Sequence, residues 1–185
     1  MKSNAHTPLC LTLAILAMIS IAWTPWGSIY ESARDERSVA DQTIDKKISL
    51  TIKANLADHD AKLALKVHVY CFLRQVFLVG ALDNAAYRAF AVMTAGGVEN
   101  VQKVTPYFVD ESDTTVDDAE IAVRVRAALI AEKALSSTQV ETETMGGEVV
   151  LLGMVRTQAD ARLAIQTALS IKGVTKVKSF LIPTK

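Results

Sequence analysis

Three histidines and two cysteines are the side chains best suited to catalysis or metal binding in this chain. His59 stands in the run Asp58-His59-Asp60, and an imidazole flanked by carboxylates is a combination found in metal sites. No second histidine and no cysteine pair stands beside it, so we interpret the run as a polar loop between a helix and a strand. His68 stands between Val67 and Val69, which predicts an exposed position on a strand.

Nucleophilic and phosphate-binding motifs give no stronger candidate. No serine, threonine or cysteine has a convincing base or acid partner in the sequence. The pairs Gly96-Gly97 and Gly146-Gly147 lack the surroundings of a phosphate-binding loop and predict turns. Cys71 lies in an apolar stretch and is expected to be a buried small hydrophobic side chain, with a reactive or intermolecular thiol as the alternative. We therefore expect a protein that is not an enzyme, with no cofactor and no metal.

A helix with apolar and basic residues is the best candidate for a binding site. In residues 118–131 the apolar side chains recur every four positions, and two arginines stand between them. Such arginines can meet lipid phosphates while apolar neighbours touch the acyl boundary, although two basic residues contribute only about 2 kcal/mol. The alternative is that both arginines are ordinary solvated residues. The candidate lipid-binding residues are Ile121, Arg124, Val125, Arg126 and Ile130, with Lys172, Lys176 and Lys178 as a weaker second basic group.

The N-terminal segment has the layout of a secretory signal. Residues 1–8 carry Lys2 and no acid, and an apolar run follows at residues 9–23. The small residues Ser20 and Ala22 predict cleavage after Ala22, which would also remove His6 and Cys10. The alternative is an uncleaved membrane anchor through residues 9–23, with tryptophans at the interface. Either outcome predicts an exported, periplasmic globular part.

Composition and charge indicate two small modules joined by an acidic linker. Half of the residues are hydrophobic and the net charge is zero, so no overall field attracts nucleic acid. Residues 45–109 carry eight basic and five acidic residues, a net +3, and residues 118–185 carry nine and seven, a net +2. The stretch between them, residues 110–117, has four acidic residues and no basic one. With residues 1–22 as signal or anchor and 23–44 as a lead-in segment, these boundaries define the domains.

An internal repeat gives the architecture of each module. Shifting the chain by 73 residues places Ile48, Ile52 and Leu56 on Ile121, Val125 and Leu129. Beyond the second helix the shift changes to 76, which pairs Gly97-Val98 with Gly173-Val174 and predicts a helix one turn shorter in the first copy. The pattern predicts an α+β fold of two tandem α-β-β-α-β modules. Each has a three-stranded mixed sheet with two helices packed on one face.

The first copy departs from the second at two positions. Arg74 stands where the second copy has Gly147, which predicts a hairpin turn of different type or length. Pro106 lies in the last predicted strand and lacks a backbone donor, which predicts an edge strand or a strand end. In the second copy, Gly153 is expected to end the second strand. Asp117 or Asp118 is expected to cap the first helix.

The repeat resembles the BON family (bacterial OsmY and nodulation). The resemblance rests on residues 147–153, Gly-Glu-Val-Val-Leu-Leu-Gly, and on the closing Gly-Val-x-x-Val at residues 173–177 and 97–101. The stretch at residues 35–39 is similar to the lead-in of dual-BON periplasmic proteins of the DolP and OsmY type. The resemblance implies a periplasmic protein that associates with phospholipid membranes or envelope partners, with lipid contact at the first helix of the second module. The lipoprotein cysteine of the DolP type is absent.

These observations predict an envelope-maintenance protein that binds anionic phospholipid surfaces, with no nucleic-acid partner. The alternatives are a protein–protein adapter and a chaperone-like osmotic-stress protein in the periplasm. The lipid or protein partner, the packing between the modules and the oligomeric state remain open at this point. We expect the second module to be the surface-binding one and the first to be its structural partner.

Overall fold

The computed structural model describes residues 38–111, 117–132, 135 and 140–185. The expected signal or anchor at residues 1–22 lies outside the described residues, as do most of the lead-in and the middle of the acidic linker. Among the described helices, none is both long and apolar enough to span a membrane. The described part belongs to one compact unit, residues 35–185.

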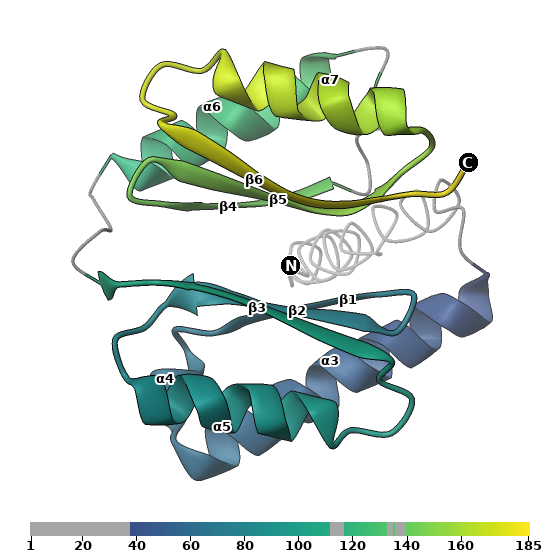
Figure 1. The fold of residues 1–185 in the computed structure, drawn as a ribbon, viewed down its shortest axis with the longest axis vertical. Helices are drawn as coiled ribbons and strands as arrows, with labels where there is room; N and C mark the ends of the chain where they lie inside the picture. Colours follow the sequence, from purple (N-terminus) through teal and green to yellow (C-terminus); the bar gives the residue numbers. More distant parts are fainter. Residues whose placement is uncertain (1–37, 112–116, 133–134, 136–139) are drawn as a thin grey trace, which may run out of the picture. The chain divides into compact units, whose positions relative to one another are not determined.

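The two modules repeat the predicted order of elements, and Figure 1 shows two long helices against one face of each sheet. In both sheets the central strand pairs antiparallel with the first strand and parallel with the last. The first module consists of α3 (Val39–His59), α4 (Ala61–Ala64), β1 (His68–Phe72), β2 (Gln75–Ala81), α5 (Ala85–Gly96) and β3 (Lys103–Val109). The second consists of α6 (Asp118–Ala131), β4 (Val140–Met145), β5 (Glu148–Val155), α7 (Gln158–Leu169) and β6 (Lys176–Pro183).

Local sequence explains where the helices begin. The Ser38 side chain accepts a hydrogen bond from the backbone of α3, and Asn84 does the same for α5. Thr157 and Asp160 form a reciprocal capping box at α7. The predicted four-residue steps are also confirmed, because α3 and α6 each bury three aliphatic side chains against their own sheet: Ile48, Ile52, Leu56 and Ile121, Val125, Leu129.

The predicted change of shift from 73 to 76 is wrong. Both α5 and α7 have 12 residues, and the hydrogen bonds after them match at a shift of 73. Val101 donates to Val98 in the first module as Val174 donates to Ile171 in the second. The left-handed residue after the helix is Asn100 (φ 69°) in one module and Gly173 (φ 98°) in the other. Asparagine tolerates this conformation, so Asn100 occupies the position of Gly173 and the two helices keep the same length.

The predicted difference between the hairpin turns is also wrong. Both hairpins have a two-residue turn, because Phe72 pairs with Gln75 and Met145 pairs with Glu148. Leu73 and Arg74 adopt φ values of 51° and 63°, the same left-handed region as the two glycines of the second turn. Bulky residues are rare in this region, so the surrounding structure must hold the turn in place.

Two smaller predictions about the strands have opposite outcomes. Pro106 lies in β3, which is an edge strand of its sheet, as its missing donor predicts. Gly153 does not end the second strand, because β5 continues to Val155 with Gly153 at a φ of 119° inside it. A glycine in a strand interior marks a bend or a close approach rather than a strand end here.

A third hydrophobic cluster joins the two sheets on the faces that their own helices leave free. Its buried members come from both modules: Phe72, Phe77, Val79, Met145, Val150, Leu152 and Met154. The rings of Phe77 and Phe180 are 5.5 Å apart in a tilted arrangement. Because β2 and β5 are covered on both faces, almost every residue of these two strands is buried.

Polar contacts at the edge of this cluster also connect the modules. Glu143 of β4 accepts a hydrogen bond from the Tyr70 hydroxyl and lies 3.0 Å from Nδ1 of His68. The hydrogen bond to Glu143 raises the pKa of His68 above its usual 6.5. Burial and the same carboxylate raise the pKa of Tyr70. Burial alone would raise the pKa of Glu143, but the bonds from His68 and Tyr70 outweigh it and lower that pKa.

The raised pKa of His68 predicts a pH-dependent contribution to stability. A group whose folded-state pKa is raised contributes fully below about pH 6.5 and loses its contribution as pH rises through the folded pKa. Because the His68 side chain is half exposed, the contribution is expected to be below about 1 kcal/mol. Urea unfolding of the wild type and His68→Gln should differ most near pH 5 and converge near pH 8. A difference that grows with pH would contradict the ion pair.

Candidate functional site

The outward face of α6 carries an apolar stripe. Val123 and Ile130 are 70% and 67% exposed, and the alanines between and beside them are also exposed. At about 100° per residue, these positions fall on one side of the helix, with Arg126 at one border and Arg124 at the other, and Glu120 is the charged residue that lies within the same arc. The exposed alanines are Ala119, Ala127 and Ala131. A solvent-facing stripe of this kind differs from the charged outer face usual for a surface helix.

The structure separates the predicted lipid-binding residues into two groups. Arg124, Arg126 and Ile130 are exposed on this outer face. Val125 is fully buried and Ile121 is 5% exposed, and both belong to the core of the second module. Sequence reasoning missed Val123, although its position seven residues before Ile130 places the two side chains on the same face.

Both arginines of α6 have acidic partners. Arg124 pairs with Glu120 one turn earlier and donates a 3.4 Å hydrogen bond to the Lys172 carbonyl. Arg126 lies 2.9 Å from Glu141 of β4. The four side chains are 43–64% exposed, so these pairs contribute little and can exchange for another anion.

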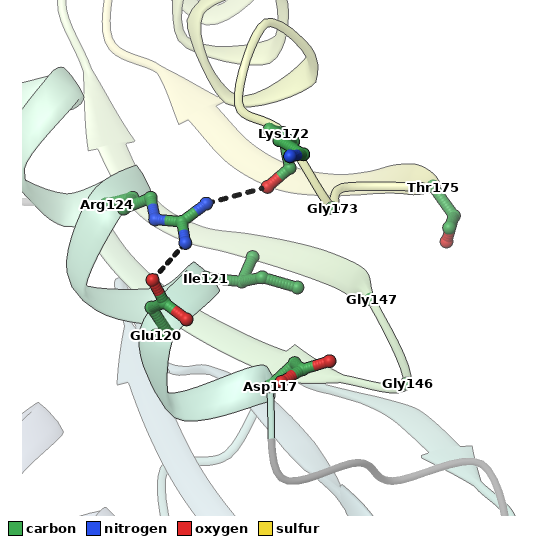
Figure 2. Close-up of a pocket in the computed structure, with 9 residues that line it drawn as sticks. All are labelled: Asp117, Glu120, Ile121, Arg124, Gly146, Gly147, Lys172, Gly173 and Thr175. Carbon is green, nitrogen blue, oxygen red and sulfur yellow. Dashed lines mark hydrogen bonds and ion pairs between the residues drawn. The ribbon is translucent and has the colours of Figure 1, made fainter.

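A shallow pocket lies next to the Arg124 border of the stripe, with a volume of about 400 Å³. Figure 2 shows Arg124 between Glu120 and the Lys172 carbonyl, Asp117 at the start of α6, and Ile121 within the pocket. Two basic and two acidic side chains line it, so the pocket has no net formal charge. The full lining is Asp117, Glu120, Ile121, Arg124, Gly146, Gly147, Lys172, Gly173 and Thr175.

Glycines keep this pocket open. A Cβ added to Gly173 would lie 2.9 Å from Cδ1 of Ile121, and one added to Gly147 would lie 2.9 Å from the Gly173 carbonyl oxygen. At the equivalent positions the first module has Asn100 and Arg74, which carry side chains. The second module is therefore the one whose backbone leaves this space, while the expected division of roles between the modules stays a prediction.

Each hairpin turn is held by a buried aspartate of the first helix in its module. The Asp118 carboxylate accepts hydrogen bonds of 2.8 Å from the backbone of both Gly146 and Gly147. Asp45 accepts bonds of 2.9 and 2.8 Å from Leu73 and Arg74 in the same way. These bonds explain why Leu73 and Arg74 keep the left-handed conformation of the glycine turn. Asp117 occupies the N-cap position of α6, but its side chain makes no capping bond.

His59 and Cys71, the other side chains suited to catalysis or metal binding, pack against residues of the first module. His59 is the last residue of α3 rather than part of a loop, and its ring stacks on Phe90 with centroids 4.0 Å apart. The Cys71 thiol is buried, and its Sγ lies 3.4 Å from Oδ1 of Asp45. Across the described residues, no three His, Cys, Asp or Glu side chains gather into a group that could hold a metal ion.

Comparison with known proteins identifies the repeat. The chain is 28% identical to osmotically-inducible protein Y of Escherichia coli, over 95% of this chain and 97% of that protein. It is 27% identical to the outer membrane lipoprotein DolP of Haemophilus influenzae, over 78% of this chain and 77% of that protein. It is also 27% identical to the 21 kDa hemolysin of Actinobacillus pleuropneumoniae, over 77% of this chain and 76% of that protein.

The model of the BON domain matches the chain twice, at residues 44–109 and 117–182. These two ranges contain both α-β-β-α-β modules, except for the N-terminal residues of α3 and the last residue of β6. None of the three relatives is named as an enzyme. The chain belongs to the BON domain family and carries two copies of the domain.

Proposed function

We propose that this chain is a non-enzymatic envelope protein that binds anionic phospholipid surfaces through the outward face of α6. Two of the relatives support an envelope or osmotic-stress role, because one is named an outer membrane lipoprotein and the other an osmotically-inducible protein. The expected export segment at residues 1–22 supports a periplasmic location.

The observation that carries the proposal is the exposed apolar stripe bordered by arginines. Val123 and Ile130 leave apolar surface in water, which a membrane interface would cover. Arg124 and Arg126 would then lie at the level of the phosphates, where each lipid anion replaces a solvent-screened glutamate. Burial of the two aliphatic side chains contributes about 1–2 kcal/mol each, and the arginines add about 1 kcal/mol each.

A sum of about 4–6 kcal/mol corresponds to weak binding, in the millimolar to tens-of-micromolar range. Binding of this strength is reversible and depends on a second contact for stable association. An N-terminal anchor, if it is retained, or another surface of the chain would supply that contact. The pocket beside Arg124 has no net charge, so it does not by itself explain a preference for anionic lipid.

Replacement of the two exposed aliphatic side chains tests the role of the stripe. Val123→Ser/Ile130→Ser is expected to lower partitioning onto phosphatidylglycerol-containing vesicles by at least about 30-fold, since two apolar contacts of about 1–2 kcal/mol each are lost. Co-sedimentation of the chain from Trp23 onward removes residues 9–22 of the apolar run and retains the whole compact unit.

The matched control is Leu65→Ser/Met93→Ser, which removes two aliphatic side chains of similar exposure from the first module. This variant should bind as the wild type does. Equal losses in both double variants would show that general hydrophobicity, rather than the α6 stripe, drives the partitioning.

A protein–protein adapter is the second candidate function. The pairing of both arginines with glutamates favours it, since a neutralised face suits a protein partner better than an anionic membrane. Recovery of a stoichiometric protein partner after detergent washing, with no vesicle binding by the wild type, would support the adapter and reject the lipid proposal. A chaperone-like osmotic-stress role would instead appear as suppression of aggregation without either partner.

A further inference from the structure

The outward face of α3 differs in charge from that of α6, although the two helices occupy equivalent places in their modules. At the shift of 73 residues, Lys46 replaces Ala119, Lys47 replaces Glu120 and Lys53 replaces Arg126. Leu50 replaces Val123 and is 54% exposed. At about 100° per residue, the three lysines and Leu50 fall within an arc of about 120° on the helix.

The lysines of α3 are exposed and, among the residues that the structure describes, have no ion-pair or hydrogen-bond partner for their side chains. The acidic residues of α3 do not neutralise them. Asp41 lies 3.7 Å from Arg74, and Asp45 is buried and bonded to the hairpin turn. Asp58 lies five residues beyond Lys53, near the end of the helix. The face therefore carries three unneutralised positive charges around one exposed leucine.

We infer that this face, defined by Lys46, Lys47, Leu50 and Lys53, is a second binding surface for the anionic headgroups of a phospholipid membrane. Its charge is complementary to such a surface, and Leu50 supplies the apolar contact at its centre. The inference rests on the proposed function for the class of ligand but not on the α6 stripe. It assigns the charge-dependent part of the binding to the first module, which the sequence suggested was only a structural partner.

The two faces differ in how salt should affect them. Arg124 and Arg126 must each give up a glutamate for a lipid anion, so the loss of that pair offsets part of the salt dependence of their binding. The α3 lysines give up only water and counterions when they bind lipid anions. Their attraction to the membrane therefore keeps its full dependence on ionic strength. Each lysine is expected to contribute roughly fivefold to the partition coefficient at low salt.

The experiment compares two triple variants of the full chain. Partition coefficients are measured on vesicles of phosphatidylglycerol with phosphatidylcholine and on vesicles of phosphatidylcholine alone, and their ratio removes any binding that does not depend on lipid charge. Lys46→Gln/Lys47→Gln/Lys53→Gln is expected to lower this ratio about 100-fold. The control, Lys62→Gln/Lys103→Gln/Lys185→Gln, removes three exposed lysines elsewhere and the same net charge, and should lower the ratio less than about fivefold.

A third variant, Lys46→Arg/Lys47→Arg/Lys53→Arg, keeps the charges and must keep the ratio if charge is the cause. Equal ratios for the α3 variant and the wild type, with the wild type well above one, would overturn this inference and leave the proposed function standing. A wild-type ratio of one would reject both this inference and the proposed function. Equal losses in the two glutamine variants would show a general charge effect and would also overturn it.

Discussion

Asp118→Ala is expected to lower the free energy of unfolding by about 3 kcal/mol, among the largest effects of any single substitution in the second module. The carboxylate is 8% exposed and accepts two 2.8 Å hydrogen bonds from backbone groups of the hairpin turn. Hydrogen bonds to a charged group contribute about 1.5–3 kcal/mol each, and alanine would leave both donors without their acceptor. Urea unfolding followed by circular dichroism measures the change.

The neighbouring residue provides the control for this prediction. Asp117 is exposed and its side chain makes no capping bond, although it has the same charge and lies at the same helix end. Asp117→Ala should change the free energy of unfolding by less than about 0.5 kcal/mol. Similar losses for the two alanine variants would mean that the helix dipole, rather than the bonds to the turn, gives Asp118 its effect.

Gly80→Ala is expected to lower the free energy of unfolding by about 3 kcal/mol. A Cβ at this position would lie 2.0 Å from the carbonyl oxygen of Lys66, a backbone atom that cannot rotate away. Relief requires a shift of the chain at Lys66–Val67 against β2, and Val67 is itself buried in the core of the first module. Insertion of extra atoms into a packed site costs typically about 1–3 kcal/mol, and a backbone neighbour places this site at the upper end.

Gly96→Ala is the matched control, since a Cβ there would meet nothing within 4 Å and the residue is the last of α5. Replacement of glycine by alanine at a compatible helical position stabilises the folded protein by about 0.4–1 kcal/mol, because it lowers the conformational entropy of the unfolded chain. Thermal or urea unfolding of the two variants should therefore shift in opposite directions. A neutral Gly80→Ala would mean that the close approach of Lys66 to β2 is absent in solution.

The repeat predicted most of the fold because each module uses the same hydrophobic periodicities. Apolar residues four apart gave α3 and α6, and the alternating stretches with their turn glycines gave the hairpin of the second module. What failed was the use of individual glycines as markers. Gly97 matched Gly173 by residue type, but the left-handed backbone belongs to Asn100, and only the φ angles reveal that equivalence.

The face-to-face packing of the two sheets was left open, although a pattern in the sequence pointed to it. The central strands contain the continuous apolar runs Val76–Val79 and Val149–Leu152, and a strand with one face in water would alternate. The aspartate–turn contacts had no such pattern. Asp45 and Asp118 each lie 28 and 29 residues before the two backbone groups they bind, so only the fold brings them together.

Only part of the candidate binding surface on α6 was predicted from the sequence. The sequence identified the helix and its arginines, but the four-residue step that places Ile121 and Val125 on the buried side was not used to exclude them from the binding surface. Ile121 and Val125 occupy the buried side, while Val123 and Ile130 occupy the outer side. The pairing of Arg126 with Glu141 depends on the position of β4 against α6, which no local pattern gives.

Binding of the wild-type chain to anionic phospholipid can be measured by its partitioning onto vesicles of increasing phosphatidylglycerol content, at low and at high salt. Binding is expected to rise with the anionic fraction at low salt and to fall steeply as the salt concentration increases, because the lysine and arginine contacts are exposed and screened. A residual affinity, independent of salt, should remain from the apolar contacts. Binding that is the same on neutral and anionic vesicles, or absent from both, would contradict a function at anionic phospholipid surfaces.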